Sequence, residues 1–314
     1  MIPTLPPAVS IREVGLRDGL QNERPVSTEA KLRLLDALAV TGVRRVELTA
    51  FVSPRAVPAM ADAEALAAQA HRWPQLEFSA LVAGPGGARR AVTARIPDVE
   101  YVLSAAEGHS QANVRRGVDE SVRLTEQIAE IVHDGGGTCE VIIATAWDCP
   151  FDGPTPPERV VEIAGHAIAL GADRISVADT VGTATPVRVV GLLDRLRAHL
   201  GDCSVGAHFH NTRGAGLASA YAAVQSGVVD LDASVGGLGG CPFAPGASGN
   251  IATEELVYLL EDCGVGTGID LSAAIDAATV ARRVVGHDLA SGVGRAGDRL
   301  RTPAASLGAT TGQG

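Results

Sequence analysis

The chain has 314 residues and a formal net charge of −10, and 46% of its residues are hydrophobic, 20% charged and 3% aromatic. This composition is typical of a globular protein whose core is built from Ala, Val, Leu and Ile. An acidic chain with few aromatic residues is a poor candidate for binding nucleic acid or an anionic membrane surface. No run of about 18 apolar residues predicts a membrane span.

The five cysteines are odd in number and form no CxxC pair. We therefore expect reduced thiols rather than a disulfide framework or a zinc ribbon. Residues 1–10 contain neither a basic region followed by an apolar run nor the composition of a transit segment, so we expect a cytoplasmic protein.

Short β-branched runs alternate with longer stretches of helical periodicity along the chain. The predicted strands are Ser10–Leu16, Arg45–Ala50, Leu76–Val82, Val99–Ser104, Cys139–Thr145, Arg174–Ala178, Val205–His210 and Val229–Ser234. Eight such units predict an α/β protein with a closed (β/α)8 TIM barrel. A doubly wound open sheet is the alternative, but the first strand runs into the polar segment 15–23 instead of a GxGxxG phosphate loop.

Proline near the start and glycine at the end delimit several of the predicted helices. These helices are Thr28–Val40, Asn113–His133, Pro156–Leu170, Pro186–Leu200, Gly214–Ser226, Thr253–Cys263 and Leu271–Val285. The segment 84–87 is predicted to be only a connection between a strand and a helix. We divide the chain into a catalytic barrel at 8–268, a C-terminal helix packed on it at 269–289 and a flexible tail at 290–314.

Polar residues gather at the carboxyl ends of the predicted strands, where TIM-barrel enzymes have their active sites. His208 and His210 lie two residues apart on one strand and should point to the same face, where both can bind one metal ion. Asp18, after the first strand, can add a carboxylate. A lone HxH pair is more often two hydrogen-bonded strand residues, but the Arg17-Asp18 pair and the glycine-rich loop after strand eight favour a site for Mg²⁺, Mn²⁺ or Zn²⁺.

Two further side chains are candidates for chemistry at this site. Arg17 can stabilise an oxyanion that develops in the transition state, although an Asp–Arg surface pair is the alternative. Cys241 follows Gly239-Gly240 in the glycine-rich loop, and its thiol could donate or accept a proton. The alternative for a free cysteine is a small buried hydrophobic residue.

Three segments resemble the 3-hydroxy-3-methylglutaryl-CoA (HMG-CoA) lyase family, namely 13–23 (EVGLRDGLQNE), 46–62 (VELTAFVSPRAVPAMAD) and 237–258, which contains the glycine-rich loop. The resemblance extends from about Ile11 to Asp270. It implies a TIM barrel that needs Mg²⁺ or Mn²⁺ and cleaves the C2–C3 bond of a branched 3-hydroxyacyl-CoA, most simply HMG-CoA to acetoacetate and acetyl-CoA, as in leucine degradation.

The resemblance also implies roles for individual residues. It places the metal ligands at Asp18, His208, His210 and Asn250. It makes Arg17, Cys241 and His208 the residues that stabilise the enolate and move protons. Supporting acidic residues would be Glu47, Asp179 and Glu254, and further contacts to the acyl-CoA substrate would come from Arg24, Asn113, Thr180 and Glu254.

The sequence departs from the family pattern after strand seven, where many members have His-Asp-Thr-Tyr-Gly. Here Asn211 removes a negative charge beside the metal, and Arg213 replaces an aromatic residue. Citramalyl-CoA or a longer-branched 3-hydroxyglutaryl-CoA is therefore an alternative substrate. A condensing enzyme of the isopropylmalate-synthase type and a metal-binding scaffold without activity are the competing functions. We expect a homodimer.

Overall fold

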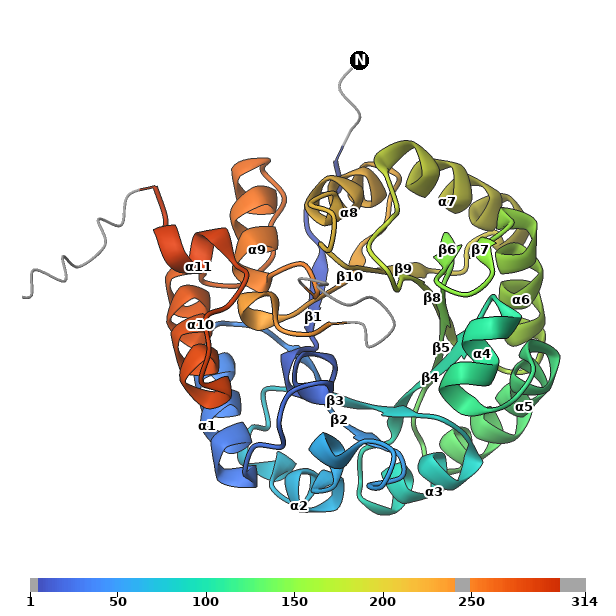
Figure 1. The fold of residues 1–314 in the computed structure, drawn as a ribbon, viewed down its shortest axis with the longest axis horizontal. Coiled ribbons are helices and arrows are strands. Elements are labelled where there is room, and N and C mark those ends of the chain that lie inside the picture. The colour runs from blue at the N-terminus through green and yellow to red at the C-terminus, as the bar shows by residue number, and fades with distance from the viewer. Residues whose placement is uncertain (1–4, 241–248, 300–314) are drawn as a thin grey trace, which may run out of the picture.

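Eight parallel strands close into a barrel that is surrounded by helices in the computed structural model, which describes residues 5–240 and 249–299 (Figure 1). The order around the barrel is β1-β10-β9-β8-β5-β4-β3-β2. Strand β1 pairs in parallel with β10 on one side and with β2 on the other, so the sheet has no free edge. The predicted TIM barrel is thus confirmed, and the open doubly wound sheet is wrong.

All eight predicted strands form, with small differences at their ends. The barrel strands are β1 Ser10–Glu13, β2 Arg45–Phe51, β3 Glu77–Val82, β4 Asp98–Ser104, β5 Cys139–Ala144, β8 Arg174–Asp179, β9 Val205–Phe209 and β10 Asp230–Ala233. A short antiparallel pair, β6 Asp148–Cys149 and β7 Gly153–Pro154, lies after β5. The first strand ends three residues earlier than predicted, because the chain turns into a π-helical segment, η1 Gly15–Gly19.

Most helices follow the strands as the alternation predicts. They are α1 Thr28–Ala39, α2 Ala63–Ala67, α3 Pro85–Thr93, α4 Glu107–Val114, α5 Val118–Asp134, α6 Pro157–Ala169, α7 Pro186–Leu200, α8 Gly216–Gln225, α9 Thr253–Asp262, α10 Leu271–Val285 and α11 Gly292–Ala296. Short 3-10 turns occur at η2 Pro58–Met60, η3 Ala70–Arg72 and η4 Val235–Gly237. Among the described residues, no helix has the length and apolar character that crossing a membrane requires.

The single helix predicted over 113–133 is wrong, because the chain breaks between α4 and α5. Arg115 takes a left-handed conformation (φ 57°) and ends α4. A new helix then starts after Gly117, where the Glu107 carboxylate accepts a hydrogen bond from the Val118 backbone amide at 2.9 Å. The break places Arg116 between the two helices and beside the end of β3, where its Nη1 donates to the carbonyl of Ala83 at 3.0 Å.

Two other segments are more ordered than the sequence predicted. Residues 84–87 are not only a connection, because Pro85 opens helix α3. In the segment 290–314, predicted to be a flexible tail, residues 292–296 form α11, whose first turn is capped by the Ser291 hydroxyl. Helix α10 packs against α1 and α9, as expected for a C-terminal helix held on the barrel.

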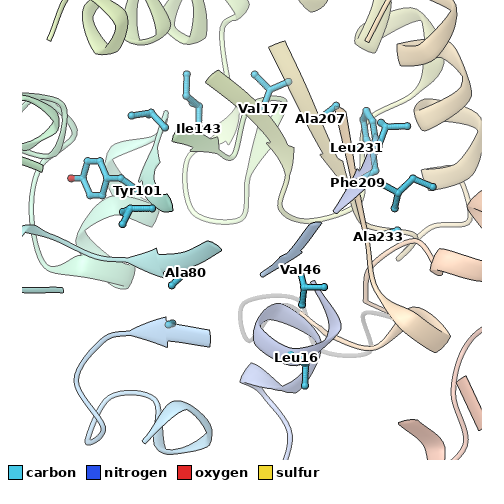
Figure 2. Close-up of a cluster of buried hydrophobic side chains, with 14 of the residues drawn as sticks. Leu16, Val46, Ala80, Tyr101, Ile143, Val177, Ala207, Phe209, Leu231 and Ala233 are labelled. Carbon is cyan, nitrogen blue, oxygen red and sulfur yellow. The ribbon is translucent and has the colours of Figure 1, made fainter. Parts of the chain in front are cut away.

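The apolar core lies between the barrel and its helices. Figure 2 shows side chains from several strands around the barrel, such as Val46, Tyr101, Val177 and Leu231, in this layer. The Tyr101 hydroxyl donates to the carbonyl of Ser121 on α5, which fixes the outward direction of this strand position. Because side chains alternate along a strand, the neighbouring positions point into the barrel.

The barrel interior below the mouth is polar. Arg12 of β1 lies at its centre, and its guanidinium contacts the carboxylates of Asp232 at 2.8 Å, Glu140 at 2.7 Å and Glu100 at 2.9 Å. All four side chains are buried. These residues come from β1, β10, β5 and β4, so the network connects strands on opposite sides of the barrel beneath the site described next.

Candidate active site

Asp18, His208 and His210 meet at the carboxyl end of the barrel. Asp18 lies in η1 directly after β1, while His208 is in β9 and His210 follows that strand. One potential ligand atom from each residue lies within 4.8 Å of the others, and both histidines are buried. The structure therefore brings together the three residues that the sequence predicted as a metal site.

Asn250 completes the same cluster from a segment that follows β10. Its amide nitrogen donates to Asp18 Oδ2 at 2.6 Å and to the carbonyl of Leu238 at 2.9 Å. Its carbonyl oxygen Oδ1 is buried and has no hydrogen-bond partner among the described residues. Such an orphaned acceptor is costly unless a ligand satisfies it.

The donor set fits a hard divalent cation. A carboxylate and an amide oxygen are ligands that suit Mg²⁺ or Mn²⁺, whereas imidazoles also suit Zn²⁺, so the donor set does not select one metal. His210 Nδ1 is also buried without a partner among the described residues, and His210 Nε2 lies 3.7 Å from Asp18 Oδ2. The orphaned Asn250 oxygen is the observation that best supports a metal ion here.

Arg17 is held beside the cluster by two carboxylates. Its Nε donates to Glu47 Oε1 at 2.6 Å, and its Nη1 donates to Asp18 Oδ1 at 2.7 Å and to Gln21 at 3.2 Å. Burial acts to lower the pKa of Arg17, but Glu47 and Asp18 outweigh it and raise this pKa above its ordinary value. The guanidinium is thus a permanent cation with a fixed orientation, and its Nη2 makes no hydrogen bond to another described residue.

His208 has a supporting carboxylate that the sequence analysis missed. Its Nδ1 lies 3.0 Å from Asp232 Oδ2, and Asp232 is in turn bound by Arg12. A carboxylate on one imidazole nitrogen sets the tautomer and leaves the other nitrogen, Nε2, with a lone pair for a ligand. The alternation of Asp230, Leu231 and Asp232 along β10 was the available signal, because it directs Asp232 into the barrel.

A cavity of about 320 Å³ opens beside these residues at the barrel mouth. Six of the predicted site residues line it, namely Arg17, Asp18, Asn113, Thr180, His208 and His210. Its other walls are mainly apolar, with Leu81, Val102 and Ile142 among them. A larger hollow of about 780 Å³ lies outside the barrel along α2 and α3, but none of the predicted site residues lines it.

Other predicted site residues lie near the cavity without lining it. Glu47 is fully buried behind Arg17. Asp179 is buried and accepts hydrogen bonds from the backbone amides of Thr183 and Ala184 at 2.9 and 3.0 Å, so it shapes the loop after β8. Burial raises the pKa of Asp179.

The remaining predicted site residues do not line the cavity. Glu254, at the start of α9, is buried and accepts from the amide of Gly236 at 3.0 Å, which ties α9 to η4. Arg24 is exposed and does not line the cavity. Cys241 lies outside the described residues.

Asn211 and Arg213, the two departures from the family pattern after β9, do not line this cavity. Asn211 accepts a hydrogen bond from the amide of Gly216 at 3.1 Å, close to the start of α8. Arg213 is exposed, and its Nη1 donates to the carbonyl of Val181 at 2.6 Å. Arg213 is therefore not placed to contact a ligand in this cavity. Arg116, which the sequence analysis did not single out, lines the cavity instead.

Comparison with known proteins gives a consistent result. A model of the HMGL-like family matches residues 8–281. The chain is 42% identical to the (R)-citramalyl-CoA lyase of Chloroflexus aurantiacus over 92% of this chain and 95% of that protein. It is 39% identical to the hydroxymethylglutaryl-CoA lyase of Pseudomonas mevalonii, over 85% and 89% of the two chains. The solved structure of an HMG-CoA lyase from Acinetobacter baumannii in complex with coenzyme A and 3-methylmalate is 37% identical and superposes with a TM-score of 0.90, covering 94% of this chain and 97% of that one.

Proposed function

Because this chain belongs to the HMGL-like family, we propose that it is a divalent-metal-dependent lyase that cleaves the C2–C3 bond of a branched 3-hydroxyacyl-CoA. The main candidate reaction converts HMG-CoA to acetoacetate and acetyl-CoA. The observation that carries this proposal is the cluster of Asp18, His208, His210 and Asn250, which stands beside a charge-paired Arg17 at the cavity.

A second candidate substrate is citramalyl-CoA, which would give pyruvate and acetyl-CoA. The 42% identity to a citramalyl-CoA lyase favours it, and that value is higher than the 39% identity to the HMG-CoA lyase of P. mevalonii. Both reactions break the same bond between a carbinol carbon and the carbon next to the thioester. A longer-branched 3-hydroxyglutaryl-CoA is a third candidate.

In this proposal Asp18, His208, His210 and Asn250 hold Mg²⁺ or Mn²⁺. When bound, the ion supplies Lewis acidity that makes the substrate 3-hydroxyl more acidic and stabilises the ketone oxygen that forms from it. The role of the surrounding protein is to fix the ligands. Asp232 orients His208, and Leu238 orients Asn250 through its carbonyl.

The protein residues then act on protons and on charge. With Nδ1–H directed to Asp232, His208 presents Nε2 to the site, and when Nε2 is not bound to the ion it accepts the 3-hydroxyl proton. The electron pair of the C2–C3 bond moves to the thioester to form an enolate, and Arg17 Nη2 donates to that oxygen. Carbon C2 takes a proton from the Cys241 thiol or from water, which releases acetyl-CoA.

Glu47 acts through Arg17 in this scheme. Its carboxylate at 2.6 Å from Arg17 Nε prevents the guanidinium from rotating away as charge develops on the substrate. Asp179 and Glu254 shape the loops that follow β8 and β10, while Asn113 and Thr180 contact the acyl group. We retain Arg24 as a CoA contact at the exposed rim. A homodimer, a cytoplasmic location and a role in leucine degradation complete the proposal.

The test is a substrate panel with the purified chain in Mg²⁺ or Mn²⁺. Products of HMG-CoA, citramalyl-CoA and longer-branched analogues are identified by mass spectrometry, which separates acetoacetate from pyruvate. We expect turnover that is lost on chelation and in Asp18→Ala, but kept in the control Asp202→Ala, which removes an exposed carboxylate after α7.

Three results would contradict the proposal. Activity that persists after full chelation would remove the metal role. Condensation of acetyl-CoA with a 2-oxo acid, without cleavage of any branched substrate, would favour an enzyme of the isopropylmalate-synthase type. Binding of Mn²⁺ without turnover of any substrate would favour a scaffold.

A further inference from the structure

The cavity contains two arginines with different electrostatic surroundings. Arg17 is paired with two carboxylates, Glu47 and Asp18, at 2.6 and 2.7 Å. Arg116 also lines the cavity, yet none of the ion pairs between described residues involves it. Its Nη1 donates only to a backbone carbonyl, that of Ala83, at 3.0 Å. Arg116 is therefore the cation of this cavity whose charge is not matched by a described carboxylate.

The chain holds Arg116 in place from both sides. The left-handed Arg115 ends α4 and Gly117 starts α5, so Arg116 lies in a two-helix corner rather than on a helix surface. The guanidinium lies close to Gly84, because a Cβ added at this glycine would stand 3.5 Å from Nη2. Arg116 is only partly exposed, so a ligand bound there is partly shielded from water.

Arg116 and the metal cluster lie on different sides of the barrel mouth. The cluster belongs to η1 after β1 and to β9, whereas Arg116 lies over the ends of β3 and β4. Strands β8 and β5 stand between β9 and β4, and β2 stands between β1 and β3. Eight strands about 4.8 Å apart and tilted by about 36° make a ring roughly 15 Å across, so one small anionic group cannot occupy both places.

The separation between Arg116 and the metal cluster distinguishes two classes of substrate. This inference rests on the proposed lyase function. A carboxylate on the carbinol carbon itself, as in a malyl-type substrate, stays at the metal cluster. A carboxylate one or more carbons further along, as in a glutaryl-type substrate, can extend toward Arg116. The cavity of about 320 Å³ is at the small end of ligand pockets, roughly 300–1,000 Å³, so it suits an acyl group rather than the CoA nucleotide.

We propose that Arg116 binds the distal carboxylate of a glutaryl-type 3-hydroxyacyl-CoA and so determines the acyl specificity of the site. The apolar side chains between the two charged ends, among them Val102 and Ile142, would contact the methyl or longer branch on C3. A guanidinium can bind a carboxylate through two parallel hydrogen bonds, so it recognises both the charge and the orientation of the carboxylate.

The experiment uses two acyl-CoA probes that have no 3-hydroxyl and therefore cannot be cleaved. One, 3-methylglutaryl-CoA, carries the distal carboxylate, and the other, 3-methylbutyryl-CoA, lacks it. Calorimetric titration with Mn²⁺ present should show the wild-type chain binding the first probe roughly 10- to 100-fold more tightly. Arg116→Gln should abolish this preference, and Arg116→Lys should keep part of it.

The matched control is Arg115→Gln, which removes the same charge one residue away from an exposed side chain that does not line the cavity. It should keep the wild-type preference. If Arg116→Gln does not fold, the comparison of Arg116→Lys with Arg115→Lys decides the question in the same way. Equal preference in wild type and the Arg116 variants overturns the inference.

A third probe separates the acyl carboxylate from the CoA phosphates. The 3-methylglutaryl thioester of pantetheine lacks the nucleotide. We expect Arg116→Gln to lower the affinity for this probe by the same factor as the affinity for 3-methylglutaryl-CoA. If the effect vanishes with this probe, Arg116 binds a phosphate and the inference is wrong. If the wild-type chain binds none of these thioesters, the proposed function fails first, and that outcome is distinct from a lost carboxylate preference.

Discussion

Replacing Asp232 by Asn should weaken metal binding although Asp232 is not itself a proposed ligand. The wild-type carboxylate accepts from His208 Nδ1 at 3.0 Å and from two nitrogens of Arg12 at 2.8 and 3.1 Å. Asparagine has almost the same shape but only one acceptor oxygen and no charge. Either His208 loses its partner or Arg12 loses one of its contacts, and the tautomer that leaves Nε2 with a lone pair is no longer enforced.

The expected magnitudes follow from these contacts. Loss of the carboxylate behind a metal-bound histidine typically costs 10- to 100-fold in metal affinity, or about 1.4–2.8 kcal/mol. Because Arg12 keeps Glu140 and Glu100 as partners, we expect the free energy of unfolding to fall by only about 2 kcal/mol, less than the loss of a whole buried ion pair. The protein should stay folded at 25 °C, so that the metal affinity can be measured.

The assay is Mn²⁺ titration by calorimetry or by electron paramagnetic resonance of the free ion, with urea unfolding measured in parallel. Asp230→Asn is the matched control, because Asp230 lies on the same strand and pairs with Arg45 at 2.6 Å, but its hydrogen bonds do not reach His208. We expect this control to lower stability slightly and leave the Mn²⁺ affinity unchanged. An unchanged affinity in Asp232→Asn, or an equal loss in Asp230→Asn, would refute the argument that Asp232 acts through His208.

Two further predictions concern the segments that position the ligands. Gly239 has φ +116°, and an added Cβ would lie 2.5 Å from the Asn250 amide nitrogen. Gly239→Ala should therefore displace Asn250 and lower the Mn²⁺ affinity at least about tenfold. The control Gly264→Ala, at φ +79° with no atom within 4 Å of the added Cβ, should leave the Mn²⁺ affinity unchanged. Burial raises the pKa of Glu13 from 4.5 to about 7, against the hydrogen bonds from Thr253 and two backbone amides. Between pH 4.5 and 7 the folded chain keeps the Glu13 proton that the unfolded chain releases. The free energy of unfolding is therefore highest below pH 4.5 and falls by about 3 kcal/mol as the pH rises to 7. Urea unfolding of Glu13→Gln from pH 4.5 to 8 should lack this decline, and a decline equal to that of wild type would contradict the assignment.

The periodicity of the sequence predicted the barrel strands well because each strand carries its own β-branched run and its own terminating loop. The same alternation predicted that His208 and His210 share a face, and the ring closure between β1 and β10 explains why Asp18 meets them. The end of β1 was placed too late, since a π-helical turn keeps the apolar pattern of a strand in residues such as Leu16.

No local pattern marks Arg116, and the alternation along β10 directs Asp232 into the barrel without indicating its partners. Asp232 takes its role from Arg12, 220 positions earlier in the chain, and only the closed barrel brings these strands together. Arg116 was placed inside a predicted helix of 21 residues, where an arginine is an ordinary solvated side chain. The left-handed conformation of Arg115 directs Arg116 to the cavity. Hydrophobic periodicity does not predict this conformation, because it is uncommon in residues other than glycine.

The charges of the site support the division of labour between its two arginines. Glu47 and Asp18 more than balance Arg17, so this trio of charged groups carries one net negative charge and does not by itself attract an anion. Arg116 adds one positive charge, which a distal substrate carboxylate would neutralise. A bound divalent ion would add two positive charges. Loss of the hydroxyl proton leaves one negative charge on the substrate, and cleavage of the C2–C3 bond moves this same charge to the thioester oxygen. In the proposed scheme Arg17 Nη2 donates to the oxygen that receives the charge, so Arg17 stabilises the transition state more than the bound substrate.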